Sequence, residues 1–232
     1  MKIALCLQGL SSGRNDKGDP VGHLKGFKTI KENILDLNDV DVFIHSWSES
    51  DSHNEEIKNL YSPIDSVFEK QIFFPYSGKG FLPAPHHENE YNPERKYHYI
   101  SSRWYSQRES LGLKKRHEEK EKFEYDLVMV SRFDVCYFTP FIFKEYSPEY
   151  FYASDDFGDP STGFNDVWFI GSSPNMDKYA TVFDNIDDYT KKDQTLSSHV
   201  IARTHAVSVG LEDKIRYTKK LPTDYQLSRR VP

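Results

Sequence analysis

The segment Arg132-Phe133-Asp134 places two opposite charges directly after the most hydrophobic run of the sequence, residues 126–130 (DLVMV). That run has the composition of a buried strand, and side chains two positions apart on a strand point to the same side. An unpaired charge at the edge of a buried strand is costly. Arg132 and Asp134 are therefore expected either to pair with each other or to face a charged ligand.

The first hydrophobic run of the chain ends at Gln8 and leads into a turn of small residues, GLSSGR, from Gly9 to Arg14. Backbone N–H groups and a guanidinium in such a turn suit a phosphate group. The turn lacks both G-x-G-x-x-G and GxxxxGK[ST], so a dinucleotide-binding fingerprint and a P-loop are excluded. An ordinary surface turn is the alternative interpretation.

A third polar strand end follows the run VDVFIH, which stops at His45, and Trp47 lies two residues further on. A tryptophan face can stack on a nucleotide base. In open α/β sheets, ligands bind outside the carboxyl ends of the strands. The three strand ends together therefore predict one binding edge.

The order of these patterns predicts an α/β fold with a mostly parallel central sheet flanked by helices. Strand, loop, helix and strand follow one another at the start of the chain, which is typical of parallel sheets. Further helices are expected over 98–122, from Ser173, and from near Asp193 to Gly210.

The polar, proline-rich stretch at about 48–97 predicts a long irregular insert with one short strand near 71–74. The sequence shows no internal repeat and no composition change typical of a domain boundary. We therefore expect a single domain over residues 1–232.

Composition narrows the class of protein. The chain has 232 residues, a formal net charge of −6 and 15% aromatic residues, which excludes a disordered chain and argues against nucleic-acid binding. No run approaches the ~20 apolar residues of a membrane span, and the N-terminal run is too short for a signal peptide. Cys6 and Cys136 lie in apolar runs and are expected to be buried free thiols, which favours a cytoplasmic location.

Four motifs in a fixed order carry a family resemblance: MKIALCLQG at 1–9, DVFIHSW at 41–47, YDLVMVSRFD at 125–134 and NDVWFIGSSPNM at 165–176. Together they resemble glycosyltransferases of the GT-A type, which have the nucleotide-diphospho-sugar transferase fold. The resemblance is closest to bacterial and viral glycosyltransferases of polysaccharide synthesis. It implies a Rossmann-like GT-A domain that moves a sugar from a nucleotide-diphospho-sugar donor to a hydroxyl of a glycan acceptor.

The resemblance also assigns roles to residues at the strand ends. Asp134 matches the metal-binding Asp of the family's Asp-x-Asp motif, which holds Mn²⁺ or Mg²⁺, whereas Arg132 stands where the first Asp would be. Either a divalent metal or the guanidinium itself would then neutralise the donor diphosphate. The donor-binding residues that the resemblance implies are Gln8, Gly9, Arg14, His45, Trp47, Arg132, Asp134 and Asn165.

Two carboxylates are candidates for the general base. Asp166 follows Asn165 at the start of a predicted strand, and Asp193 lies where the last helix is expected to begin. The dipole at a helix N-terminus favours an ionised carboxylate near neutral pH, as a base requires. Each residue also has a structural alternative, an Asx turn for the first and an N-cap for the second. Inverting and retaining chemistry remain open.

Two other functions fit the same residues. The first is a sulfo- or phosphotransferase-like enzyme with the loop at residues 8–14 as its phosphate cradle. The second is a non-catalytic module that binds a glycan or a nucleotide, with its charged groups in structural roles.

Overall fold

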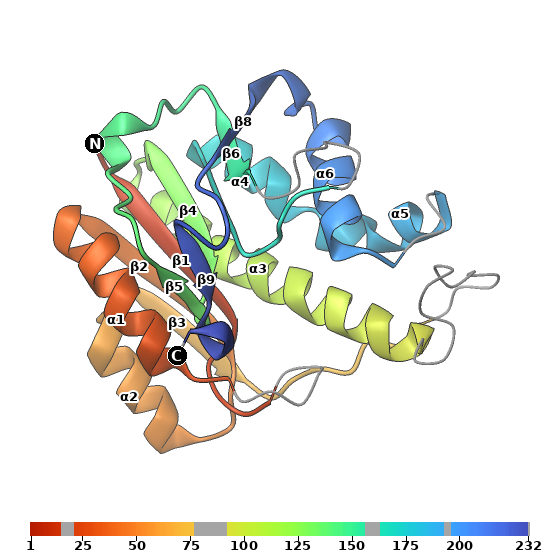
Figure 1. Cartoon of the computed structure of the whole chain (residues 1–232), viewed down its shortest axis with the longest axis horizontal. Coiled ribbons are helices and arrows are strands. Elements are labelled where there is room, and N and C mark those ends of the chain that lie inside the picture. The colour runs from red at the N-terminus through yellow and green to blue at the C-terminus, as the bar shows by residue number, and fades with distance from the viewer. Residues whose placement is uncertain (15–20, 77–91, 156–162, 193–195, 232) are drawn as a thin grey trace.

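A computed structural model describes residues 1–14, 21–76, 92–155, 163–192 and 196–231. Its centre is a seven-stranded sheet in the order β3-β2-β1-β4-β7-β6-β8 (Figure 1), and a two-stranded sheet pairs β5 with β9. The strands are β1 (Ile3–Leu10), β2 (Val40–Trp47), β3 (Asp65–Glu69), β4 (Leu127–Arg132), β5 (Val135–Tyr137), β6 (Phe151–Ser154), β7 (Trp168–Gly171), β8 (Ile215–Thr218) and β9 (Tyr225–Leu227).

Helices cover both faces of the large sheet (Figure 1). Buried residues of α1 and α2 join one hydrophobic core, and those of the other four helices join a second core on the opposite face. The helices are α1 (His23–Asn33), α2 (Asp51–Tyr61), α3 (Pro93–Glu121), α4 (Ser173–Ala180), α5 (Ile186–Lys192) and α6 (Ser198–Ser208). The expected α/β class is confirmed.

Four neighbouring strands of the sheet, β3-β2-β1-β4, are parallel, while β7 runs antiparallel to β4 and to β6. The chain passes from β1 to β2 and β3 on one side and later adds β4 on the other side of β1. The order of the strands therefore reverses between β1 and β4. In open α/β sheets, a ligand crevice forms at such a switch point, outside the carboxyl ends of the strands.

The stretch expected to be irregular, about 48–97, departs from that expectation in its first half. It contains α2 and the fourth parallel strand, β3, whereas 71–74 forms no strand. Ser50 caps α2 by accepting a hydrogen bond from the N–H of His53. Only Ile57 and Tyr61 of this helix are buried, so its sequence is mostly polar and hides the helical pattern.

Two helix starts also differ from the sequence expectation. The third helix begins at Pro93 rather than His98, because the Asn92 side chain caps it. The last helix begins at Ser198, with Ser197 as its N-cap, rather than near Asp193. Asp193 itself lies outside the described residues, so its expected place at a helix N-terminus stays a prediction.

Both cysteines have the burial that the sequence predicts. Cys6 and Cys136 are both buried free thiols. Across the part of the chain that the structure describes, no helix has the length and apolarity needed to cross a membrane.

Candidate functional site

Three of the residues expected at the site lie in one row across the sheet. Gln8 of β1 is in register with His45 of β2 on one side and with Arg132 of β4 on the other. Side chains alternate along a strand, and the residues two positions earlier, Cys6 and Val130 among them, belong to the core on the α3 face. The row therefore points to the α3 side of the sheet at the switch point.

Arg132 and Asp134 form a bidentate ion pair. Arg132 Nε lies 2.7 Å from Oδ1 of Asp134, and a terminal nitrogen of the same guanidinium lies 2.6 Å from Oδ2. Asp134 is buried, with a second guanidinium, that of Arg229, 3.9 Å from Oδ2. Of the two arrangements that the sequence left open, the structure shows the one in which Arg132 and Asp134 pair with each other.

This arrangement does not fit a divalent cation at Asp134. Both carboxylate oxygens already accept hydrogen bonds from Arg132, and Arg229 adds a second positive charge nearby. Mg²⁺ and Mn²⁺ prefer several oxygen ligands, and two guanidinium groups would repel them. The charge that the family resemblance ascribes to a metal is present here on arginine side chains.

Asp166 forms a second ion pair, with Arg103 on α3. Its Oδ2 lies 3.0 Å from Nε of Arg103 on α3, and Arg103 also donates a hydrogen bond to the Asp166 backbone carbonyl. Ser198 donates to Oδ2 at 2.6 Å, and His199 Nδ1 is 3.7 Å from Oδ1. The helices α3 and α6 thus converge on this carboxylate.

The pairing decides the basicity of Asp166. Burial by itself would raise the pKa of this carboxyl, but the guanidinium of Arg103, with His199, Arg132 and the Ser198 hydroxyl, holds the pKa well below its usual range. The group therefore stays ionised at neutral pH. It is a weak base, because its pKa lies far below neutral pH whereas an efficient general base has a pKa near the working pH.

His45 and Trp47 are enclosed by protein. His45 is fully buried, with Nε2 2.9 Å from a Glu69 carboxylate oxygen and Nδ1 2.7 Å from the Ser106 hydroxyl. Burial lowers the pKa of His45, which favours the neutral ring. Trp47 stacks on Tyr105 of α3 at a centroid distance of 5.3 Å.

Ser106 ties this second group of side chains to the first strand. Its hydroxyl oxygen accepts a hydrogen bond of 2.7 Å from the Gly9 N–H while also contacting His45. Gly9 has a φ of 98°, a conformation that glycine adopts without strain. Arg14, at the end of the turn, is exposed.

Gln8 and Asn165 complete the set expected from the sequence. Gln8 is 1% exposed, and neither its amide nitrogen nor its amide oxygen has a hydrogen-bond partner among the described residues. A buried polar group without a hydrogen-bond partner lowers the stability of the fold by about 1–3 kcal/mol. Asn165 donates to the Tyr225 hydroxyl at 2.9 Å, which joins the crevice to the C-terminal segment.

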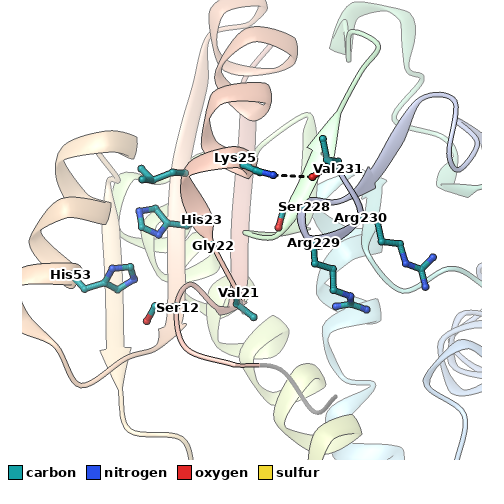
Figure 2. A pocket seen from close by; sticks show the side chains of 11 residues that line it. Ser12, Val21, Gly22, His23, Lys25, His53, Ser228, Arg229, Arg230 and Val231 are labelled. Atoms are coloured by element: carbon teal, nitrogen blue, oxygen red, sulfur yellow. Dashed lines mark hydrogen bonds between the residues drawn. The ribbon is translucent and has the colours of Figure 1, made fainter. Parts of the chain in front are cut away.

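An open cavity of about 810 Å³ has Arg229 in its wall (Figure 2). It lies between the β1–α1 turn, the start of α1 and the C-terminal segment at 228–231. Among the described residues that line it, the ionisable side chains are basic: His23, Lys25, His53, Arg229 and Arg230. Arg229 lines the cavity and also approaches the Asp134 carboxylate.

The sequence interpretation missed the partners that come from distant segments. The C-terminal arginines reach the crevice because β9 pairs with β5, and the Ser228 N–H donates to the Asp134 carbonyl at 2.8 Å. Arg103 lies in the helix that the sequence predicts over 98–122, four residues before the buried Gln107. A polar i, i+4 pair on a buried helix face was the available signal.

The fold and the site define an α/β protein in which Arg103, Arg132 and Arg229 pair with two carboxylates at the switch point of a mostly parallel sheet. No protein-family model and no curated protein matches the sequence. Among solved structures, the chain is similar to the apo form of the glycosyltransferase GlyE from Streptococcus pneumoniae TIGR4, with 11% identity and a TM-score of 0.46. That likeness covers 94% of this chain and 45% of GlyE, so the chain spans less than half of that protein.

A second structure of GlyE gives 10% identity and a TM-score of 0.45. The chain is also similar to a protein from Desulfovibrio desulfuricans G20 whose assignment as a nucleotide-diphospho-sugar transferase is provisional. In that case identity is 12%, the TM-score is 0.46, and 95% of this chain and 81% of the other are covered. At such identities the likeness concerns the path of the chain.

Proposed function

We propose that the protein is a glycosyltransferase that moves a sugar from a nucleotide-diphospho-sugar donor to a hydroxyl group of a glycan acceptor. One observation carries the proposal: the guanidinium groups of Arg103, Arg132 and Arg229 surround the carboxylates of Asp134 and Asp166 at the switch point. Three positive charges face two negative ones, which suits an anionic ligand. The four sequence motifs favour a nucleotide diphosphate as that ligand.

Charge neutralisation by arginine is the central step of the proposed chemistry. When the bond between the sugar and the diphosphate breaks, negative charge grows on the leaving phosphate. Preorganised guanidinium groups stabilise that charge, and Arg132 is held in place for this role by Asp134. Because the geometry at Asp134 does not fit Mn²⁺ or Mg²⁺, no step depends on a metal there.

The Arg132 cluster consists of the Arg132–Asp134 ion pair and the nearby Arg229. The donor would extend from this cluster into the basic cavity that Arg229 also lines. In this proposal, the Gly9 turn and Arg14 contact the diphosphate, and Gln8 turns its unpaired amide toward the donor. His45 and Trp47 would border the base or the ribose after a small shift of the enclosing side chains, or would hold the edge of the site through Ser106.

The acceptor side centres on Asn165 and Asp166. The low pKa of Asp166 favours a positioning role for this carboxylate, which orients Arg103 and Ser198. Asp193 remains a candidate for the base of an inverting reaction, and its place lies outside the described residues.

A donor screen tests the proposal. Nucleotide sugars, added singly with Mn²⁺ or with EDTA, should raise the melting temperature for at least one donor, and the same donor should be hydrolysed slowly. We expect the Arg132→Gln variant to lose the shift. Arg108→Gln, on α3 but paired with Glu109 and Asp184, is the matched control and should keep it.

Three results would contradict the proposal. No shift with any donor would remove its basis. A preference for adenosine 3′,5′-bisphosphate would favour the sulfotransferase-like alternative. A shift without hydrolysis or transfer would favour the non-catalytic binding module.

A further inference from the structure

Three metal-ligating side chains meet where the start of α1 lies beside the first turns of α2. His23 comes from α1, and His53 and Glu56 come from α2. His23 Nε2 lies 3.7 Å from one Glu56 carboxylate oxygen, and His53 Nδ1 lies 3.7 Å from the other. All three ligand atoms lie within 4.8 Å of one another. The two histidine rings lie side by side on the wall of the cavity, edge to face with 4.7 Å between their centroids (Figure 2).

A hydrogen bond to the Ser11 backbone selects the tautomer of the neutral His23 ring that can bind a metal. His23 Nδ1 lies 3.2 Å from the Ser11 backbone carbonyl. A carbonyl only accepts hydrogen bonds, so Nδ1 carries the hydrogen and the neutral ring leaves a lone pair on Nε2. Histidine ligands of metals commonly donate their other ring N–H to a carbonyl or a carboxylate in this way.

The Nε2 atom of His23 is itself without a hydrogen-bond partner in the described part of the chain. The side chain is 8% exposed, so the lone pair is withdrawn from water. A buried, unpartnered acceptor is unfavourable unless something occupies the position that it faces. Here that position is shared with His53 and Glu56.

Ser11 also orients the second histidine. Its hydroxyl lies 2.9 Å from Nε2 of His53 and 2.7 Å from the hydroxyl of Ser46. If Nε2–H donates to Ser11, and Ser11 donates to Ser46, the His53 and Ser11 hydrogens both have acceptors. Nδ1 of His53 then presents its lone pair toward Glu56. One serine thus positions both imidazoles, through its carbonyl and its hydroxyl.

We propose that His23 Nε2, His53 Nδ1 and the Glu56 carboxylate form a binding site for one divalent transition-metal ion, with Zn²⁺ as the best fit. Two imidazoles and one carboxylate are a zinc ligand set, and they leave one coordination position open. In a tetrahedral zinc site neighbouring ligand atoms are about 3.4 Å apart. Each histidine nitrogen lies at a similar distance, 3.7 Å, from a Glu56 carboxylate oxygen. Mg²⁺ and Ca²⁺ prefer oxygen ligands throughout.

The ion would connect the start of α1 to α2 at the edge of the basic cavity. This site is separate from the Asp134 cluster and does not depend on glycosyl transfer. The open position would accept water or an anionic group of a ligand bound in the cavity, since both histidines line it. The alternative is a plain ion pair between Glu56 and a protonated histidine.

Titration of the metal-free protein tests the site. The full chain is treated with a chelator, dialysed and titrated with Zn²⁺ against a chromophoric zinc indicator. Co²⁺ then serves as a spectroscopic probe, because tetrahedral Co²⁺ absorbs strongly in the visible range. We expect one Zn²⁺ per chain and a tetrahedral Co²⁺ spectrum.

Matched variants identify the ligands. Glu56 has a 46% exposed side chain, so Glu56→Gln should fold normally, and we expect it to weaken Zn²⁺ binding by about 100-fold or more. Glu55→Gln, one position earlier and paired with Lys58, should bind like the wild type. Ser11→Ala should weaken binding by about 10- to 100-fold through loss of orientation.

Circular dichroism confirms folding of each variant before titration. Absence of Zn²⁺ binding to the wild type would overturn the proposal, as would equal affinities of the Glu56→Gln and Glu55→Gln variants. Selective loss in Glu56→Gln and in a His53→Gln variant, with the Co²⁺ spectrum lost in parallel, would support it.

Discussion

At the scale of single residues, Arg132 and Asp134 show what strand spacing can and cannot predict. The alternation of side chains places both on one side, and the cost of an unpaired charge predicts a partner for each. Both predictions need only the ten consecutive residues at 125–134. The nearby Arg229 was not predicted, because it reaches Asp134 only through the pairing of β5 with β9.

The ion pair should show strong coupling in a double-mutant cycle. Arg132→Gln leaves a buried carboxylate partly unpaired, and Asp134→Asn leaves a half-buried guanidinium without this carboxylate. The double variant leaves neither, so its loss of stability should be smaller than the sum of the two. We expect a coupling free energy of about 1–3 kcal/mol from urea unfolding, given the mostly buried carboxylate and the bidentate geometry.

Additive effects of the two substitutions would contradict this interpretation and would mean that Asp134 interacts mainly with Arg229. An Arg229→Gln variant, measured in the same cycle, distinguishes the two partners. At 3.9 Å, its coupling to Asp134 should be the weaker one.

At the scale of secondary-structure elements, hydrophobic periodicity predicted the buried elements and missed the half-exposed ones. The strands β1, β2 and β4 are nearly continuous apolar runs, as strands covered on both faces must be. By contrast, α2 buries only Ile57 and Tyr61, and β3 has no fully buried residue. Elements at the edge of a sheet give a weak sequence signal because one side stays in water.

The position of α1 depends on a glycine at a close approach. A Cβ atom at Gly26 would collide with the backbone carbonyl of Phe133 and would lie 3.2 Å from the carbonyl oxygen of Val135. These are backbone atoms of the turn that carries Asp134, so they cannot move cheaply. Gly26→Ala should therefore destabilise the protein by about 1–3 kcal/mol and reduce binding at the Arg132 cluster.

The control for that prediction is Gly112→Ala in α3. There a Cβ would lie 3.4 Å from the end of the flexible Arg116 side chain, which can move aside. Alanine is the better helix former, so this variant should be more stable by about 0.5–1 kcal/mol. Denaturant midpoints of the two variants that shift in the same direction would contradict the argument.

At the scale of the whole molecule, the sequence predicted the class of fold but not the connections that close the site. Local order along the chain implies a mostly parallel sheet with helices on both faces, and the structure has this arrangement. The crevice also needs Arg103 from α3, Ser198 from α6 and the C-terminal segment. Contacts between segments so distant in sequence have no signature in periodicity or composition, which is why Ser198 and the C-terminal arginine were not predicted.

Stability of the whole fold should fall in mild acid because of buried histidines. His205 is fully buried, with Nδ1 2.7 Å from the Tyr189 hydroxyl and Nε2 3.2 Å from the Lys178 carbonyl. Both contacts are satisfied by the neutral ring. Burial lowers the pKa of His205 to about 4, whereas the unfolded chain takes up the proton near pH 6.5.

Between these two values the unfolded state binds more protons than the folded state, so the free energy of unfolding must decrease as the pH decreases. The contribution of His205 is complete above pH 6.5 and is lost as the pH falls toward 4, with a total on the order of 3 kcal/mol. Urea unfolding at several pH values between 4.5 and 7 measures this slope. A His205→Gln variant should flatten it in part, since the pKa of His45 is also lowered by burial. Titration of the His205 ring by NMR provides an independent reading, and a ring that protonates near pH 6.5 in the folded protein would contradict the prediction.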